Sequence, residues 1–364
     1  MYERVEKTPR RERTARRART VILSAPILCC LLLLLTGCTG SQTNDTQQGT
    51  GQSSDQETNV PAAAGQGQWY EVAALPVGRS EIAVTQTEDA MYVLGGYTPE
   101  TKSSVLVTSY DPQDDVWQEL APLPEGLNHI ASAATGGRVY SFGGFTEQNR
   151  GAVDSAYEYD PQSDTWTELP TMPTPRGSAA AVALHGQLHV IGGADDVSTT
   201  GSRQNVASHE VYDPATGQWS EAAPLPSPRE HMPAVVYEGQ IHIVGGRFLE
   251  MTNNTGTHEV YDPETDSWEQ AAPLPTPRSG HAAAVLEDQI LIMGGERDPE
   301  SETGTFEENE GYDPATDSWT ALAPLPTPRH GFGAAVFDGA VYAPGGAPVN
   351  GGGQQSDVNE VFTL

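Results

Sequence analysis

The chain of 364 residues contains cysteine only at positions 29, 30 and 38. No disulfide can therefore stabilise a domain that lies after Cys38. The sequence also lacks any long segment with an apolar period of 3.6, the pattern of an amphipathic helix. Short apolar runs bounded by Gly, Pro and Asp fill most of the chain instead. This pattern is typical of short strands separated by turns, so we expect an all-β fold.

Basic residues are few, with 19 Lys and Arg against 49 Asp and Glu. Residues 1–37 hold eight of the basic and three of the acidic residues, which leaves 11 basic and 46 acidic residues and a net charge of −35. Such a surface repels nucleic acid and anionic lipid head groups, so we expect no nucleic-acid partner. Adaptation to a saline habitat would explain the same acidity, and the sequence does not separate the two.

Long hydrophobic runs are missing as well, because the longest, Val21–Leu35, has 15 mostly apolar residues. A transmembrane helix needs ~20 such residues. The run follows the eight basic residues and precedes small residues, an order that describes an export signal. An uncleaved anchor helix is the alternative.

The sequence "LTGC" at residues 35–38 resembles a bacterial lipobox. The resemblance implies that residues 1–37 are a signal peptide and that Cys38 becomes the lipidated N-terminus. The protein would then be anchored in a membrane of the cell envelope and face the extracytoplasmic side. Residues 38–67 are rich in Gly, Ser, Thr and Gln, which predicts a flexible linker. The pairs Arg10-Arg11 and Arg16-Arg17 leave the export route open between general secretion and the twin-arginine system.

A repeat occupies the rest of the chain. All six tryptophans precede a double glycine by 26 residues, and the Tyr of each "YDP" precedes its Trp by seven. Only the segment between the double glycine and the next Tyr varies in length, from 13 to 18 residues. A fixed period of this size indicates a solenoid or a propeller. The double glycines begin at Gly95, Gly143, Gly192, Gly245, Gly294 and Gly345.

Each unit supplies four short apolar runs, which we name strands a to d. One unit reads "PAVVY" from Pro233, "IHIVGG" from Ile241, "HEVYD" from His258 and "SWEQA" from Ser267. The "DPETD" segment predicts the turn between strands c and d, because Pro presets φ and Asp bonds the local backbone. A Trp at fixed register in strand d is expected to pack between units, and a stacking platform for a ligand is the alternative.

These residues resemble the kelch-repeat family, whose blades carry a double glycine after strand b and a Tyr and Trp at fixed separation in strands c and d. The resemblance covers residues 69–364 and implies a six-bladed β-propeller over residues 68–364. The chain enters with an orphan strand d, "QWYEVAAL" from Gln68, and leaves after a strand c, "NEVFTL" from Asn359. Pairing these two strands would complete blade six and protect the edges.

The loops between strands b and c and between strands d and a emerge on one face of such a propeller. We name this the b–c loop face, and its variable loops make it the candidate binding site. A motif of the "PLPTPR" type precedes strand a, and its arginines could form an anion-binding rim or be structural, each paired with an acid of a neighbouring blade or packed against its loop. These candidates are Arg79, Arg176, Arg229, Arg278 and Arg329, with Leu127 in the second unit's place. Four histidines follow closely and join the candidates: His129, His231, His281 and His330.

No metal or cofactor is expected, because these histidines come from different blades without a shared close spacing. His189 and His242 occupy a strand b position and are predicted to pack. The copper oxidases of the kelch fold need a Cys crosslinked to a Tyr, which no residue after Cys38 can provide. We therefore expect a monomeric, non-catalytic module that binds a protein or an anionic glycan. A sugar-acid mutarotase of the kelch type is the alternative.

Overall fold

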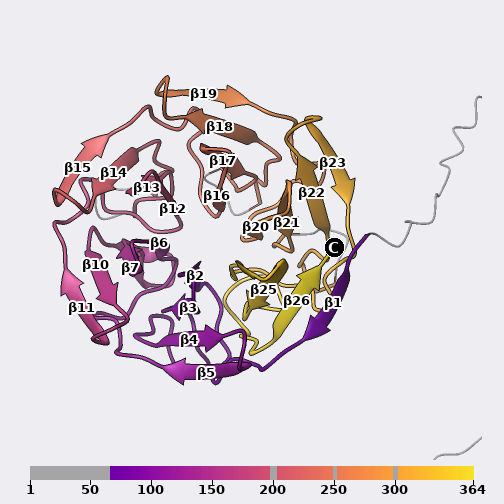
Figure 1. Cartoon of the computed structure of the whole chain (residues 1–364), viewed down its shortest axis with the longest axis horizontal. Helices are drawn as coiled ribbons and strands as arrows, with labels where there is room; N and C mark the ends of the chain where they lie inside the picture. Colours follow the sequence, from indigo (N-terminus) through magenta and orange to yellow (C-terminus); the bar gives the residue numbers. More distant parts are fainter. Residues whose placement is uncertain (1–65, 197–202, 249–251, 298–301) are drawn as a thin grey trace, which may run out of the picture. The chain divides into compact units, whose positions relative to one another are not determined.

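The computed structural model describes residues 66–196, 203–248, 252–297 and 302–364. Strands in these ranges form six four-stranded antiparallel sheets around a common axis (Figure 1). The same ranges contain no helix, and hence none that could cross a membrane. The expected six-bladed β-propeller is confirmed. The predicted signal peptide, Cys38 and the linker up to residue 65 lie outside the described residues.

Each blade runs outward from strand a, nearest the axis, to strand d at the rim (Figure 1). Blades 1 and 2 comprise β2 (Ala83–Gln86), β3 (Met91–Leu94), β4 (Val107–Asp111), β5 (Val116–Glu119), β6 (Ala131–Thr135), β7 (Arg138–Phe142), β10 (Ala156–Asp160) and β11 (Thr165–Glu168). Blades 3 and 4 comprise β12 (Ala180–Leu184), β13 (Gln187–Ile191), β14 (His209–Asp213), β15 (Gln218–Glu221), β16 (Ala234–Tyr237), β17 (Gln240–Val244), β18 (His258–Asp262) and β19 (Ser267–Gln270). Blades 5 and 6 comprise β20 (Ala282–Leu286), β21 (Gln289–Met293), β22 (Asn309–Asp313), β23 (Ser318–Ala321), β24 (Ala335–Phe337), β25 (Ala340–Pro344), β26 (Asn359–Thr363) and β1 (Gln68–Glu71).

The ring closes as the sequence predicts. Strand β1 pairs antiparallel with β26, with Trp69 opposite Phe362, so the first strand of the propeller completes the last blade. The two rings lie 5.0 Å apart between centroids. Closure therefore joins the two ends of the domain and leaves the last blade with its full set of strands.

The double glycines lie where neighbouring blades approach each other. Gly245 and Gly246 have φ of 64° and 95°, a region that L residues with a side chain rarely adopt. A Cβ atom on Gly246 would lie 2.8 Å from the carbonyl oxygen of Glu230, and one on Gly245 would lie 2.6 Å from the ring of His281 in the next blade. Glycine is therefore required both for the turn and for the contact between blades.

The tryptophans join neighbouring blades, as predicted. Each Trp Nε1–H donates a hydrogen bond of 2.8–3.0 Å to a carbonyl that follows strand d of the preceding blade. Trp268, for example, donates to Ala223. Apolar side chains fill the space between the sheets, such as Ile191 of blade 3 with Ile241 and Ile243 of blade 4. Burial of this apolar surface is the main source of stability.

A Trp69→Phe substitution tests this joint at the point of closure. It keeps the aromatic packing but removes the hydrogen bond of Trp69 Nε1–H to the carbonyl of Ala323. We expect the free energy of unfolding to fall by about 1 kcal/mol, measured by urea denaturation followed by circular dichroism. A Tyr70→Phe control changes a side chain that is 46% exposed and should have no effect. Equal stability of the two variants would contradict this role.

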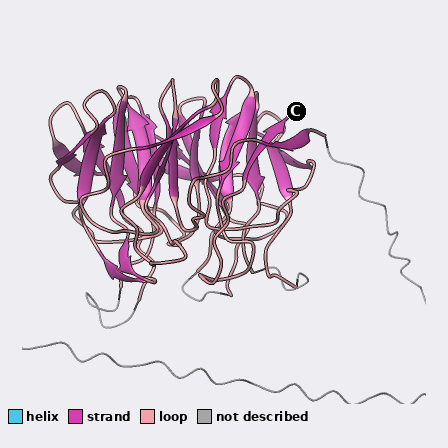
Figure 2. Cartoon of the chain, turned by 90° about the horizontal axis from the view of Figure 1, so that it is seen from below, coloured by secondary structure: helices cyan, strands magenta, loops and turns pink. Residues whose placement is uncertain are grey.

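The longest loops project from one face of the propeller, the lower face in Figure 2. They are the b–c loops, and the loop of blade 2 carries a two-stranded hairpin, β8 (Phe145–Glu147) and β9 (Arg150–Ala152). The a–b turns at the opposite end are short. The fold therefore gathers the variable segments on the b–c loop face.

Candidate functional site

The residue at one repeat position faces the propeller axis in every blade, and we name these six residues the axial ring. In five of the six, the backbone N–H donates to the carbonyl of the member in the preceding blade at 2.8–3.1 Å. Ile82 N, next to the sixth member Glu81, closes the ring on Gly331 O at 3.4 Å. All six have φ between 52° and 65°. The axial ring consists of Glu81, His129, Ser178, His231, Gly280 and Gly331.

The axial ring borders a cavity of about 200 Å³ that small strand a residues such as Ala131 and Ala234 also line. A second cavity of about 500 Å³ extends along the same strands and shares Ser132 and Ala283 with the first. The two cavities are successive sections of the axial channel. Alanine and serine keep this channel open, because their side chains are too short to fill it.

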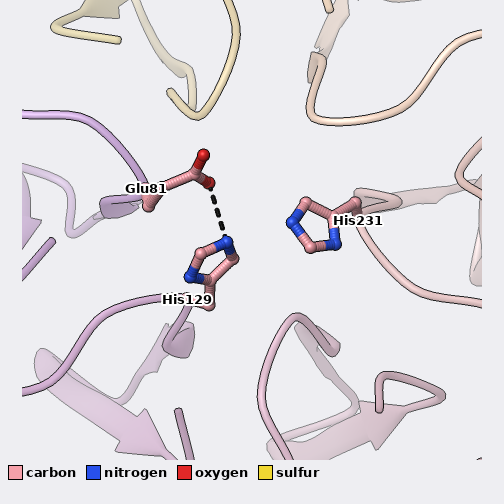
Figure 3. Close-up of side chains that lie close together, drawn as sticks. All are labelled: Glu81, His129 and His231. Atoms are coloured by element: carbon pink, nitrogen blue, oxygen red, sulfur yellow. Dashed lines mark ion pairs between the residues drawn. The ribbon is translucent and has the colours of Figure 1, made fainter. Parts of the chain in front are cut away.

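Glu81 lies between two histidines at the mouth of the channel. Its Oε2 is 3.1 Å from His129 Nε2, and its Oε1 is 3.3 Å from His330 Nε2 (Figure 3 shows the first of these contacts). Burial alone would raise the pKa of Glu81, but the charges and hydrogen bonds of the two histidines lower it well below its usual range. Burial opposes protonation of His330, yet Glu81 and Glu296 raise its pKa. The arrangement therefore favours a charged carboxylate beside a protonated histidine.

Arg247 links the other half of the cluster. Its Nε lies 3.1 Å from Glu230 Oε1, its Nη1 pairs with Glu296, and its Nη2 donates to His231 Nε2 at 2.9 Å. Burial first, and then the positive charge of Arg247, lower the pKa of His231 to about 4, so this imidazole is neutral at pH 7. Burial would raise the pKa of Glu230, but its neighbours His231, Arg247 and Arg203 lower it instead.

We name these residues the central cluster; each is 8% exposed or less. Its negative charges are balanced by arginine and histidine, as buried charges require. The cluster lies at the centre of the b–c loop face and can bind ions or exchange protons there. Its members are Glu81, His129, Glu230, His231, Arg247, Glu296 and His330.

Loops from several blades cover the central cluster. The Lys102 amine of blade 1 donates to the Gly352 carbonyl of blade 6, and Asn350 N donates to Thr303 O of blade 5 at 2.8 Å. The Arg203 guanidinium lies 5.7 Å from the centre of the Phe145 ring. A ligand on this face would therefore contact the loops before it reached the cluster.

The arginines of the repeated motif are buried, with 0–1% of each residue exposed. Arg79 has no carboxylate partner among the described residues and donates to Thr108 Oγ1 and two backbone carbonyls. No guanidinium of this set is available to a ligand, so these residues do not form the anion-binding rim. They fit the structural alternative with one correction, since each acid belongs to strand c of the same blade and not to a neighbouring blade. The pairs are Arg176–Glu210, Arg229–Glu259, Arg278–Glu310 and Arg329–Glu360.

The four candidate histidines divide into two groups. His129, His231 and His330 belong to the central cluster. His281 also lines the axial cavity, but its Nε2 lies 3.1 Å from the Val244 carbonyl of the preceding blade. Burial lowers its pKa to about 3, so it remains neutral. His281 therefore joins blade 5 to blade 4.

Two signals in the sequence were missed. Glutamate is the second residue of strand c in four blades with the motif arginine, whereas blade 2 has Leu127 and Tyr157 at the two positions. This co-occurrence indicates a pair within one blade. Counting two residues onward from the arginine position gives the axial ring, including Glu81, which was not among the candidates.

The remaining basic residues are unevenly distributed. Of the 11 after residue 37, five are the buried motif arginines, and Arg138 lies beside the a–b turn of blade 2. The other five all lie on the b–c loop face: Lys102, Arg150, Arg203, Arg247 and Arg297. Positive charge outside the motif is therefore concentrated on one face of an acidic protein.

Comparison with known proteins agrees with this architecture. The chain is 32% identical over 147 residues to Kelch-like protein terF of Aspergillus terreus, which is 40% of this chain and 32% of the relative. It is 28% identical over 138 residues to Kelch-like ECH-associated protein 1A of Danio rerio, or 38% of this chain and 15% of the relative. The chain thus spans only about a third or less of the length of these curated relatives.

A solved structure titled "Structure of YjhT" superposes with a TM-score of 0.67 over 80% of this chain and 97% of that chain. At 18% sequence identity this likeness shows the fold alone. The profile of the KLHDC2/KLHL20/DRC7 Kelch-repeats domain matches residues 64–246 and 200–346, most of the chain. The chain therefore belongs to the kelch-repeat family.

Proposed function

We propose that this kelch propeller is a non-catalytic binding module that recognises an anionic protein segment or glycan through its b–c loop face. The observation that carries the proposal is the concentration on that face of the basic residues outside the motif, in a protein whose residues 38–364 carry a net charge of −35. Basic side chains gathered on one face of an acidic protein attract anionic groups and select their orientation, even where acidic residues lie among them.

Four of the five loop cations are placed to meet a ligand. Lys102 is half-buried and Arg150 is exposed. The side chains of Arg203 and Arg297 are 20% and 21% exposed. Guanidinium groups bind carboxylates through paired hydrogen bonds, which suits acidic peptides and carboxylated sugars. The similarity to Kelch-like ECH-associated protein 1A, whose name describes association with another protein, supports a binding role.

A screen of the full chain against immobilised carboxylated glycans and acidic peptides tests the proposal. We expect binding that weakens as the salt concentration rises from about 50 to about 300 mM, because exposed charges are screened over that range. Selective binding of neutral or cationic ligands, independent of salt, would contradict it.

We further propose that a lipid on Cys38 tethers the domain to the cell envelope. The order of basic, apolar and small residues in the first 38 positions supports this placement. A Cys38→Ser variant should leave the membrane fraction, whereas a Cys29→Ser control, altered within the segment expected to be removed, should remain in it. Fractionation followed by immunoblotting measures both. Retention of the Cys38→Ser variant in the membrane would favour an uncleaved anchor helix.

The central cluster favours a second candidate, a sugar-acid mutarotase. Glu81 contacts two histidines, and such paired groups can move protons during ring opening and closure of a sugar. Interconversion of the anomers of a sugar acid, followed by NMR with the purified chain, distinguishes this activity from binding alone. Catalysed interconversion that is lost in a Glu81→Gln variant would establish the enzyme.

A further inference from the structure

We propose that the axial ring binds a divalent transition-metal ion through Glu81, His129 and His231. One ligand atom from each lies within 4.8 Å of the others, although the three residues come from blades 1, 2 and 4. Figure 3 shows the Glu81 carboxylate and one nitrogen of each imidazole directed toward a common space. The propeller thus assembles at its axis a set of ligands that no local motif contains.

The tautomer of His129 follows from its neighbour Asn128. The Asn128 Nδ2 lies 2.8–3.2 Å from four acceptors, so this atom must be the amide nitrogen. Its Oδ1 therefore faces His129 Nδ1 at 2.6 Å and accepts a hydrogen bond from it. The lone pair of neutral His129 then lies on Nε2, which points at Glu81. Histidines that bind metals are held in this way by an acceptor on the opposite ring nitrogen.

A cation is needed between Glu81 and His129. The carboxylate Oε2 and the imidazole Nε2 are 3.1 Å apart, and two lone pairs at that distance repel each other. A proton or a metal ion between them removes the repulsion. His231 Nε2 is directed to the same space, and a metal ion can use this third donor, whereas a shared proton cannot.

The donor set selects the class of metal. Two imidazoles and one carboxylate suit Zn²⁺ and Fe²⁺, whereas Mg²⁺ and Ca²⁺ prefer oxygen ligands. Three protein ligands also leave a coordination position for water, and the adjoining cavity of about 200 Å³ has room for it. Ser178, the ring residue between the two histidines in sequence, lines this cavity, and its buried Oγ has no hydrogen-bond partner among the described residues.

Four of the 14 described non-glycine residues with positive φ lie in the axial ring, and the others lie outside it. Glu81, His129, Ser178 and His231 adopt φ of 52–55°, while glycine fills the equivalent places in blades 5 and 6. A side chain in this region is sterically strained, because its Cβ lies too close to the backbone. Such strain is typical of functional sites, and here it falls on the proposed ligands and on the serine beside them.

Metal binding would change one contact of the central cluster. Arg247 Nη2 donates to His231 Nε2 at 2.9 Å, and the metal would take the place of this hydrogen bond. Arg247 would keep its pairs with Glu230 and Glu296, so its charge would remain balanced. The ligand atoms would also move closer, since metal–ligand bonds measure ~2.0–2.2 Å.

Titration of the chelator-treated full chain with Zn²⁺, and with Co²⁺ as a spectroscopic probe, tests the site. We expect one equivalent to bind, with Co²⁺ absorption bands of a nitrogen and oxygen site, and no competition from Mg²⁺ or Ca²⁺. His129→Gln and His231→Gln should each weaken binding by at least the ~10–100-fold that loss of a supporting contact costs. A His185→Gln control alters an exposed histidine in the a–b turn of blade 3 and should bind normally.

Absence of stoichiometric binding to the wild-type chain would overturn the proposal and assign the cation to a proton. Binding that survives in both histidine variants would overturn it as well. Circular dichroism checks that the variants fold, and Glu81→Gln serves as a third ligand variant if either histidine variant does not. The titration requires no envelope ligand, so its outcome is independent of the proposed binding function.

Discussion

An Arg229→Ala variant is expected to lose about 3–5 kcal/mol of unfolding free energy, because it leaves the buried Glu259 carboxylate without its partner. The side chains of the two residues are 0% and 1% exposed. Arg229 also donates to the carbonyls of Gly245 at 2.7 Å and Ile243 at 3.1 Å, which would lose their donors. Urea denaturation compared with the wild type measures the loss.

Blade 2 supplies the matched control for this variant. It has Leu127 and Tyr157 where blade 4 has Arg229 and Glu259, and it folds without the charge pair. Arg229→Leu combined with Glu259→Tyr should therefore recover most of the lost stability, since an apolar pair can replace a buried ion pair. Unchanged stability of Arg229→Ala with loss of anion binding would show instead that the arginine serves a ligand.

Acidification from about pH 7 to pH 5 is expected to lower the free energy of unfolding by several kcal/mol. Each histidine that stays neutral in the folded chain but is protonated in the unfolded chain lowers it by about 2 kcal/mol at pH 5. His189 Nδ1 lies 2.8 Å from His209 Nε2, and His209 Nδ1 donates to the Ala223 carbonyl. His242 and His258 repeat this arrangement in blade 4 at 2.9 Å. Burial lowers the pKa of His189, His209 and His258 to about 4 and that of His242 to about 3.

The direction of this change in stability follows from comparison with the unfolded chain, in which histidine has a pKa near 6.5. As the pH falls below about 6.5, the unfolded chain binds protons that the folded chain excludes. The stability is complete above that pH and is lost progressively toward pH 4. His330 has a raised pKa and contributes in the opposite direction, with stability that is lost as the pH rises through its folded value. This single opposite contribution from His330 does not offset the four histidines whose pKa is lowered.

Blade 1 suggests the variant that tests this cause. Tyr92 and Val107 occupy there the positions of His189 and His209 in blade 3. The double variant His189→Tyr with His209→Val should therefore show a shallower loss of stability between pH 7 and pH 5. A His185→Gln variant alters an exposed histidine whose charge contributes less than burial to the lowered pKa of His189, so its slope should stay much closer to that of the wild type. Parallel slopes in all three proteins would contradict the assignment.

The sequence predicts the fold well because the same local sequence pattern recurs in every blade of the propeller. The spacing of Trp and double glycine sets the strand register, and the strands observed around His258 and Ser267 begin at the expected residues. Closure through Trp69 follows from counting strands in complete blades. These features depend only on contacts along the chain or with the adjacent blade. The sequence period gives such contacts directly.

The site is harder to predict, because it depends on which side chains meet across the axis. His129 and His231 were rejected as metal ligands for lack of close spacing, yet the ring places them in contact, with 4.8 Å between ring centroids. The histidines differ by one residue in their distance from the motif position, and this difference determines what each side chain contacts. His281, for example, contacts the Val244 carbonyl of the preceding blade. The role of the motif arginines was left open between an anion-binding rim and structural pairs, because repetition of the unit is compatible with both.

The most direct test of the central claim is the affinity of the chain for a carboxylated ligand from the screen after neutralisation of loop cations. A Lys102→Gln, Arg150→Gln, Arg297→Gln triple variant removes charge from the b–c loop face, and Arg138→Gln removes it from the opposite side. We predict that the Kd of the triple variant rises at least about tenfold, or about 1.4 kcal/mol, while that of Arg138→Gln is unchanged. An unchanged Kd in the triple variant, or a comparable rise in Arg138→Gln, would contradict binding through the b–c loop face.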